Sequence, residues 1–373
     1  MPYKASLFLL SVSLLTSSLS SAYLPLDIEE ARYQKANIEI SSVNQFQPTL
    51  EKTFSLQAQA GNTLWQQSVQ TVQNEIFDDR PLYWSRLTQR SLLKIVKQHP
   101  PLSDQDRHSA INAFAKSSRG ITDITYRQDT DIKILITGFD PFFLDHDITQ
   151  SNPSGLAALF LDGFTFNVGN KKVQIESVVI PVRFADFDEG LIESILTPVF
   201  RDNQADMVFT ISMGRDDFDL ERFPGLNRSA EAPDNLNVYT GATREKPLPP
   251  KLNDKNLEGL EFVEFTLPVA AMQSVKGPWK VNDNRKVRTL ASGEIEAKSL
   301  EELNGEVSVS GSGGGYLSNE ISYRSIRLMN EYKRQIPNGH IHTPRVEGYD
   351  EETERKIVMQ IRDMIIAAAG AAQ

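Results

Sequence analysis

Short β-rich runs alternate with helix-like stretches from about residue 131 to the end of this 373-residue chain. The first run, IKILITGF, is of the kind that forms a strand buried on both faces. Similar runs follow at VQIESVVIPV, DMVFTIS and EVSVSGS. The helix-like stretches between them include NPSGLAALFL, FDEGLIESILTPVF and EISYRSIRLMNEYKRQ. This alternation predicts an α/β domain whose largely parallel sheet is covered by helices on both faces.

The segment before this domain has a different pattern. From residue 23 to about residue 127, apolar residues recur at helical spacing and no convincing alternating strand is present. A length of 373 residues suggests one large domain with a smaller companion. We therefore predict a helical N-terminal extension at residues 23–130 and an α/β domain at residues 131–373.

The first residues, 1–22, have the layout of a secretory signal peptide. Lys4 precedes an apolar stretch from Ala5 to Leu15, and small residues lead up to Ala22. The apolar run is shorter than the roughly 20 residues that span a bilayer, so an uncleaved anchor is not expected. We predict cleavage after Ala22 and export to the periplasm or the extracellular space, with no membrane attachment afterwards.

Composition narrows the classes of partner and of chemistry. The formal net charge is -10, so a nucleic-acid groove or a basic membrane-binding face is not expected. The chain has no cysteine, which excludes disulfides, zinc–thiolate sites and a cysteine nucleophile. A small peptide fits as the substrate, and neither a cofactor nor a metal is predicted. The oligomeric state stays open, a homo-oligomer included.

A glycine-rich stretch, SGSGGGYLSN, precedes one helix-like segment and contains Ser318 near its end. Serine hydrolases place their hydroxyl on a sharp strand-to-helix turn, where backbone N–H groups can stabilise an oxyanion. The glycines let the backbone approach a substrate, and the dipole of the following helix favours negative charge. The alternative is that Ser318 is only the N-cap of this helix, as a serine before a helix commonly is.

A serine nucleophile needs a base to take its proton, so a histidine is required. The chain has five histidines: His99, His108, His146, His340 and His342. Strand alternation in GHIHTP places the last two on one face, where one could reach a site while the other only packs. The carboxylate that orients the base comes from the run GRDDFDLERF, and spacing alone selects none of its candidates: Asp216, Asp217, Asp219 and Glu221. This run lacks the glycine and the closing glutamate of a calcium loop.

Six segments in order resemble the pyroglutamyl peptidase I (pyrrolidone carboxyl peptidase) family of cysteine peptidases. The resemblance runs from about residue 132 to the C-terminus. Its segments are ITGFDPF, NPS, LERF with Asn227 and APDN, TLPV with Met272, SGSGGGYLSN and HIHTP. Each segment is common by itself, but six in the right order are fairly specific.

The resemblance implies an α/β/α sandwich with a mixed sheet, and release of N-terminal pyroglutamate from peptides without a metal. It places the nucleophile at Ser318, the general base at His342 and the orienting carboxylate at Glu221. In the nucleophile segment and directly after it, two residues depart from the family: Ser318 stands where the family has cysteine, and Glu320 where it has histidine. Export to a thiol-oxidising compartment gives a physical reason for the first exchange.

The resemblance also implies a substrate pocket. Phe139 and Phe142 match the aromatic residues that hold the pyroglutamyl ring, which suits a flat, uncharged lactam. Asn227 is the third substrate-binding residue that we predict. The usual glycines after the first loop are Phe143 and Leu144 here. The helical extension and the segment after Met272 have no counterpart in the family.

These residues support three hypotheses. The first is an exported hydrolase in which Ser318 attacks the amide of an N-terminal pyroglutamyl group. The second is a catalytically inactive member of the family, which binds pyroglutamyl or other small ligands through Phe139 and Phe142. The third is a hydrolase of another small amide or ester, because Phe143 and Leu144 reshape the pocket.

Overall fold

The computed structural model describes residues 24–36, 49, 53–95 and 103–372. The predicted signal peptide lies outside the described residues. None of the helices within these ranges is both long enough and apolar enough to cross a membrane.

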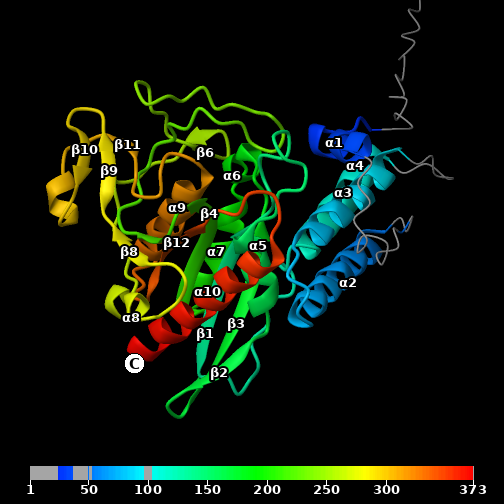
Figure 1. The fold of residues 1–373 in the computed structure, drawn as a ribbon. Helices are drawn as coiled ribbons and strands as arrows, with labels where there is room; N and C mark the ends of the chain where they lie inside the picture. The colour runs from blue at the N-terminus through cyan, green and yellow to red at the C-terminus, as the bar shows by residue number, and fades with distance from the viewer. Residues whose placement is uncertain (1–23, 37–48, 50–52, 96–102, 373) are drawn as a thin grey trace, which may run out of the picture.

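A seven-stranded sheet in the order β2-β3-β1-β4-β12-β5-β8 forms the centre of the fold (Figure 1). The middle strands β3, β1, β4 and β12 are parallel, whereas β2 and β5 run antiparallel to their inner neighbours. The parallel strands are buried for most of their length because their residues are apolar on both faces. The seven strands are β1 (Ile132–Phe139), β2 (Thr165–Val168), β3 (Lys171–Ile180), β4 (Met207–Arg215), β5 (Phe218–Glu221), β8 (Val281–Asn284) and β12 (Asn338–Pro344).

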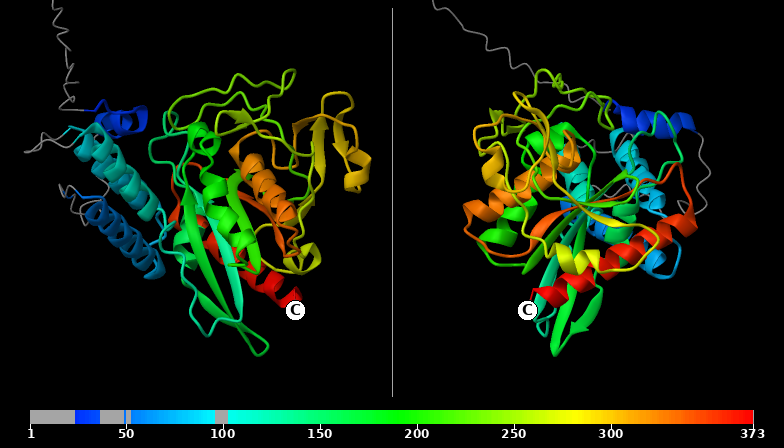
Figure 2. Two further views of the ribbon diagram at one scale, coloured as in Figure 1. Left: turned by 180° about the vertical axis from the view of Figure 1, so that it is seen from behind. Right: turned by 60° about the vertical axis from the view of Figure 1, so that its left-hand side comes forward.

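Helices cover both faces of this sheet. α5 and α10 lie together on one face, and α7 and α9 lie together on the other (Figure 2). The layers therefore confirm the predicted α/β/α arrangement with a mixed, largely parallel sheet. The helices of this part are α5 (Pro153–Leu161), α6 (Phe184–Asp188), α7 (Leu191–Arg201), α8 (Val269–Gln273), α9 (Leu317–Glu331) and α10 (Glu351–Ala371).

The N-terminal part is helical, as predicted, and packs on the α5 side of the sheet (Figure 1). Side chains cap two of its helices: Thr53 accepts from the N–H of Leu56, and Ser103 accepts from the N–H of Asp106. Trp65 and Phe114 of these helices are fully buried and join the core of the α/β part. The four helices are α1 (Ile28–Ala36), α2 (Phe54–Gln73), α3 (Arg80–Ile95) and α4 (Asp104–Ser117).

The run EVSVSGS was predicted as a strand of the main sheet, and this is wrong. Only Ser308–Ser310 is a strand, and it belongs to a separate antiparallel sheet, in the order β10-β9-β11. Its alternation of serine and valine suits a short strand of a small sheet, not a strand between two helical layers. The new elements are β9 (Lys286–Thr289), β10 (Gly293–Glu296), the 3-10 helix η2 (Leu300–Leu303) and β11 (Ser308–Ser310), with a separate hairpin of β6 (Lys251–Leu252) and β7 (Lys255–Asn256).

Candidate active site

A small cavity of about 60 Å³ lies at the carboxyl ends of the parallel strands, where open α/β sheets bind their ligands. We call it the aromatic pocket. Its walls come from the ends of β1, β3 and β4 and from the start of α5 and α9. The lining residues are Phe139, Phe142, Asn152, Val182, Ser212, Met213, Tyr316, Leu317 and Ser318. The structure thus brings Phe139, Phe142 and Ser318 to one cavity. Phe139 and Ser318 are 179 positions apart in the sequence (318 − 139).

The aromatic wall includes a strained backbone position. Phe142 contacts Phe143 with ring centroids 4.5 Å apart. Phe143 has a φ of 62°, in the left-handed region that residues other than glycine rarely adopt. Phenylalanine therefore occupies a backbone conformation that favours glycine. Strain of this kind is concentrated at ligand-binding loops.

Ser318 lies in the first turn of α9, and it is not the N-cap. The N-cap is Tyr316, so the alternative that Ser318 merely caps the helix is wrong. Its Oγ donates to the carbonyl oxygen of Gly313 at 3.3 Å, and its side chain is partly exposed in the pocket. The first helical hydrogen bond runs from the N–H of Glu320 to Tyr316. Among the described residues, the N–H groups of Leu317 and Ser318 have no hydrogen-bond partner, so they can stabilise an oxyanion.

His342 and Glu221 form a buried pair on adjacent strands. β12 and β5 are antiparallel, with His342 opposite Asp219, so Glu221 is a diagonal neighbour on the same face. His342 Nδ1 lies 2.5 Å from Glu221 Oε1. Of the four carboxylates that the sequence left open, Glu221 is the one that contacts this imidazole.

The other ring nitrogen of His342 faces the end of β4. A Cβ built on Gly214 would lie 4.0 Å from His342 Nε2, and the preceding residues Ser212 and Met213 line the aromatic pocket. Nε2 makes no hydrogen bond within the described part of the chain. Ser318 Oγ and His342 Nε2 are therefore not hydrogen-bonded to each other in this structure. Catalytic hydrogen bonds of this kind commonly tighten only when substrate binds.

Two further polar side chains hold Glu221. Arg215 Nη2 donates to Glu221 Oε1 at 3.2 Å, and Asn284 Nδ2 donates to Oε2 at 2.8 Å. Both side chains also donate to the carbonyl oxygen of Ser312, at 2.9 and 3.0 Å. The carboxylate is thus tied to the glycine-rich loop that leads to Ser318.

Burial controls the protonation of this pair. Burial raises the pKa of Glu221 to about 8, although Arg215 and Asn284 oppose that rise. Burial, and then the positive charge of Arg215, hold the pKa of His342 well below its usual value. The imidazole is therefore neutral at neutral pH, which is the form that can accept a proton.

His340 has a structural role next to this pair. Its ring lies on the same face of β12, with its centroid 4.8 Å from that of His342. Both of its nitrogens are occupied, at 2.8 Å from Thr210 Oγ1 and 2.7 Å from Ser212 Oγ. These contacts agree with the expectation that one of the two histidines only packs.

Asn227 lies outside the aromatic pocket, contrary to the prediction that it binds the substrate there. Its Nδ2 donates to Ser308 O at 2.9 Å and to Glu261 Oε2 at 3.0 Å, so the buried amide holds two loops together. Arg215 and Asn284 were not predicted as site residues. Arg215 belongs to the segment SMGRDD beside the acidic run, whereas Asn284 is the last residue of β8.

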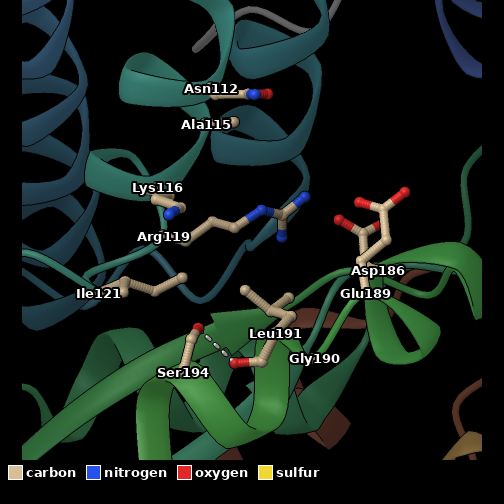
Figure 3. A pocket seen from close by; sticks show the side chains of 10 residues that line it. All are labelled: Asn112, Ala115, Lys116, Arg119, Ile121, Asp186, Glu189, Gly190, Leu191 and Ser194. Carbon is tan, nitrogen blue, oxygen red and sulfur yellow. Dashed lines mark hydrogen bonds between the residues drawn. The ribbon is translucent and has the colours of Figure 1, made fainter. Parts of the chain in front are cut away.

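The helical N-terminal part holds the first pocket loop in place. Asp140, next to Phe139, is 2% exposed and accepts from Arg86 of α3 at 2.8 Å and from Arg119 at 2.7 Å. Burial alone would raise the pKa of Asp140, but the two arginines outweigh it and lower that pKa. Arg119 also lines a cavity of about 270 Å³ between α4 and the start of α7, where Glu189 lies across from it (Figure 3).

We expect Arg86→Met to lower the free energy of unfolding by about 3–5 kcal/mol, because it removes one of the two partners of a buried carboxylate. Urea unfolding measures this change. Arg201→Met is the matched control, since Arg201 is exposed and, among the residues that the structure describes, pairs only with its neighbour Asp202. The control should stay within about 0.5 kcal/mol of the parent. Equal unfolding midpoints for Arg86→Met and the parent would contradict the assigned role.

Two family models match this chain. The model described as the C-terminal domain of PA0049 matches residues 133–257 and 262–347, and the model of the PA0049 N-terminal domain matches residues 22–115. A relative is the uncharacterized protein PA0049 of Pseudomonas aeruginosa. It is 27% identical over 390 aligned positions, which cover 80% of this chain and 70% of that protein.

Among solved structures, the chain is similar in fold to pyrrolidone carboxyl peptidase from Pyrococcus furiosus. One such structure is 19% identical with a TM-score of 0.44, and it covers 65% of this chain and 100% of the peptidase. A single-residue mutant of the same peptidase is 20% identical, with a TM-score of 0.43 and the same coverage. These likenesses concern the fold alone.

Proposed function

This chain belongs to the PA0049 protein family, and we propose that it is a hydrolase that removes a small N-terminal acyl group, pyroglutamyl first among them, from peptides. The single observation that carries the proposal is the placement of Ser318 Oγ. It opens into a pocket with two phenylalanine walls, at the free N-terminus of a helix. The paired His342 and Glu221 lie close by in the sheet, because His342 is the β12 partner of Ser212, a β4 residue that lines the pocket. A nucleophile, a base and a carboxylate in this order form a hydrolytic triad.

In the proposed acylation step, Ser318 Oγ attacks the carbonyl carbon of the amide and its proton passes to His342 Nε2. The N–H groups of Leu317 and Ser318 stabilise the oxyanion of the tetrahedral intermediate. The carbon–nitrogen bond then breaks, and His342 gives its proton to the leaving amine. Glu221 keeps the imidazole oriented and stabilises the imidazolium while it exists.

In the deacylation step, water attacks the acyl ester on Ser318 and gives a proton to His342. The carbon–oxygen bond of the ester breaks, His342 returns the proton to Ser318, and the free acid leaves. The pocket selects the acyl group in this scheme. Its volume of about 60 Å³ and its apolar walls at Phe139 and Phe142 suit a small, flat ring.

We expect kcat/KM to rise with pH through about 8, because Glu221 must lose its proton for the site to act. A protonated Glu221 donates to His342 Nδ1, which leaves the ring proton on Nε2, where it blocks transfer from Ser318. Once ionised, Glu221 accepts from Nδ1–H and Nε2 becomes an acceptor. The pKa of His342 lies well below its usual value, so His342 adds no second rise near neutral pH.

Initial rates between pH 6 and pH 9.5 measure this profile. Glu221→Gln cannot titrate, so its residual kcat/KM should be independent of pH across the same range. A flat or falling profile for the parent would exclude Glu221 as the controlling group.

A second candidate function is a binding module without turnover. One observation favours it, since Ser318 Oγ donates to Gly313 O instead of to His342. Incubation with pyroglutamyl-7-amido-4-methylcoumarin separates the two functions. The hydrolase releases the fluorescent amine, whereas the binding module gives heat of binding in calorimetry and leaves the amide intact.

We also propose that the protein is exported. The apolar stretch from Ala5 to Leu15 and the small residues before Ala22 support this. Mass spectrometry of the protein from its native host would give a mature N-terminus at residue 23. A chain that retains residues 1–22 would overturn the proposal.

A further inference from the structure

A second cavity adjoins the aromatic pocket and has no role in the mechanism above. It has a volume of about 740 Å³, and we call it the outer cleft. Its walls are the glycine-rich loop at residues 310–315, the loop at residues 229–245, and strands β9 and β10. One continuous stretch of chain lines both cavities, because Gly314 and Gly315 face the outer cleft and Tyr316 to Ser318 face the aromatic pocket.

The outer cleft also reaches the residues that hold the proposed base. Arg215 and Asn284 line it, and both donate to Glu221. A molecule that enters both cavities therefore meets Ser318 in one of them and the partners of Glu221, Arg215 and Asn284, in the other. The aromatic pocket is the smaller of the two by far, so it takes the acyl side and leaves the cleft for the leaving group.

Charged side chains of both signs line the cleft. Its lining has four basic residues, Arg215, Arg244, Lys286 and Arg288, and three acidic residues, Glu231, Glu245 and Glu294. Arg215 is paired with Glu221, which lies outside the lining, so the other charges of the lining balance (3 − 3).

Three of the four basic residues already form ion pairs with acidic side chains. Arg215 is engaged by Glu221, and Lys286 and Arg288 share Glu294 at 3.3 and 3.7 Å. Arg244 is exposed and, within the described residues, makes no ion pair. It is therefore the cation of the cleft that is free to meet a carboxylate.

The backbone of the glycine-rich loop suits an extended peptide. Gly314 has a φ of 89°, and a Cβ built there would meet nothing within 4 Å, so its open side faces free space. A peptide chain can therefore approach the loop closely and bind through its own backbone groups. The walls from β9 and β10 lie in the segment after Met272, which has no counterpart in the resembling peptidases.

We propose that the outer cleft binds the leaving-group side of the substrate, and that this leaving group is a peptide with a carboxylate near Arg244. The inference rests on the proposed function and adds the class of peptide to it. The carboxylate is either an acidic side chain close to the scissile bond or the C-terminus of a short peptide.

Kinetics with four substrates test the inference. They are pyroglutamyl-7-amido-4-methylcoumarin, a pyroglutamyl tripeptide with glutamate after the scissile bond, the same tripeptide with lysine, and the glutamate tripeptide with an amidated C-terminus. We expect Arg244→Glu to lower kcat/KM for the glutamate tripeptide about five-fold, as for loss of one exposed ion pair. The aminocoumarin substrate should be unchanged. The lysine tripeptide should improve if Arg244 meets the acidic side chain, and it should lose about as much as the glutamate tripeptide if Arg244 meets the C-terminus.

The amidated tripeptide separates the two sources of the carboxylate. If it keeps the five-fold effect, the acidic side chain meets Arg244, and if it loses the effect, the C-terminus does. Arg201→Glu carries the same change of charge on α7, outside the cleft lining, and should change none of the four values.

The same proteins are titrated by calorimetry with the leaving tripeptide alone, which requires no catalysis. Weaker binding to Arg244→Glu than to Arg201→Glu supports the cleft even in a protein that hydrolyses nothing. Equal effects of Arg244→Glu on all four substrates, together with equal binding of the tripeptide, overturn the inference. Absence of turnover with all four substrates by the parent overturns the proposed function instead.

Discussion

Replacing Ser318 by alanine should lower kcat for a pyroglutamyl substrate by at least about a thousand-fold, because the acyl-enzyme can no longer form. Release of aminomethylcoumarin measures the loss. Ser322→Ala is the matched control, since it makes the same change one turn further along α9. The Ser322 hydroxyl is buried and has no hydrogen-bond partner in the described part of the chain, so its removal should leave kcat within about two-fold. Full activity in Ser318→Ala would remove the nucleophile from the account.

Ser318→Cys extends this test. The chain has no cysteine, so the variant carries a single thiol and any thiol chemistry reports on this position alone. We expect turnover that iodoacetamide abolishes, because the alkylated sulfur cannot attack the amide. An active cysteine variant beside an inert parent would identify the parent as a binding module that lost its chemistry through the serine.

Replacing His342 by asparagine should cost about as much as replacing Ser318, because the serine is a weak nucleophile without its base. We expect a loss of about a thousand-fold in kcat. The double variant of Ser318→Ala with His342→Asn should be no slower than either single variant, since the two residues act as one unit. His108→Asn serves as the control, because His108 is exposed on α4.

The double variant also gives the result that would count against the triad. If each substitution lowers kcat and the two losses multiply, Ser318 and His342 act independently of each other. His342 would then support the fold or the pocket, and another group would have to take the proton of the serine.

The layered fold was predictable because its signal is local. The apolar runs at β1, β3 and β4 and the helical spacing between them need no knowledge of distant residues. β11 was misassigned since it is only three residues long and its pairing depends on β9, which lies in a stretch rich in charged and polar residues. Strands β8, β9 and β10 were not predicted, for the same reason.

The site was predictable only in part. The spacing of the carboxylates in GRDDFDLERF did not indicate which of them orients the histidine. Glu221 was assigned this role because of the order of segments that the chain shares with a family. The structure explains the choice, because the antiparallel register of β5 and β12 sets Glu221 on the same face as His342. Arg215 and Asn284 could not be assigned, since their shared partner is defined by contacts across the chain. Asn227 was assigned from the resemblance to the family, and its amide instead joins Ser308 and Glu261.

Labelling with a fluorophosphonate probe, followed by peptide mapping, tests the central claim most directly, because the probe reacts only with a serine that its base activates. The account predicts one modified residue, Ser318, with labelling lost in Ser318→Ala, strongly reduced in His342→Asn and kept in Ser322→Ala. A parent protein that stays unlabelled, or that is labelled at any other serine, would contradict it.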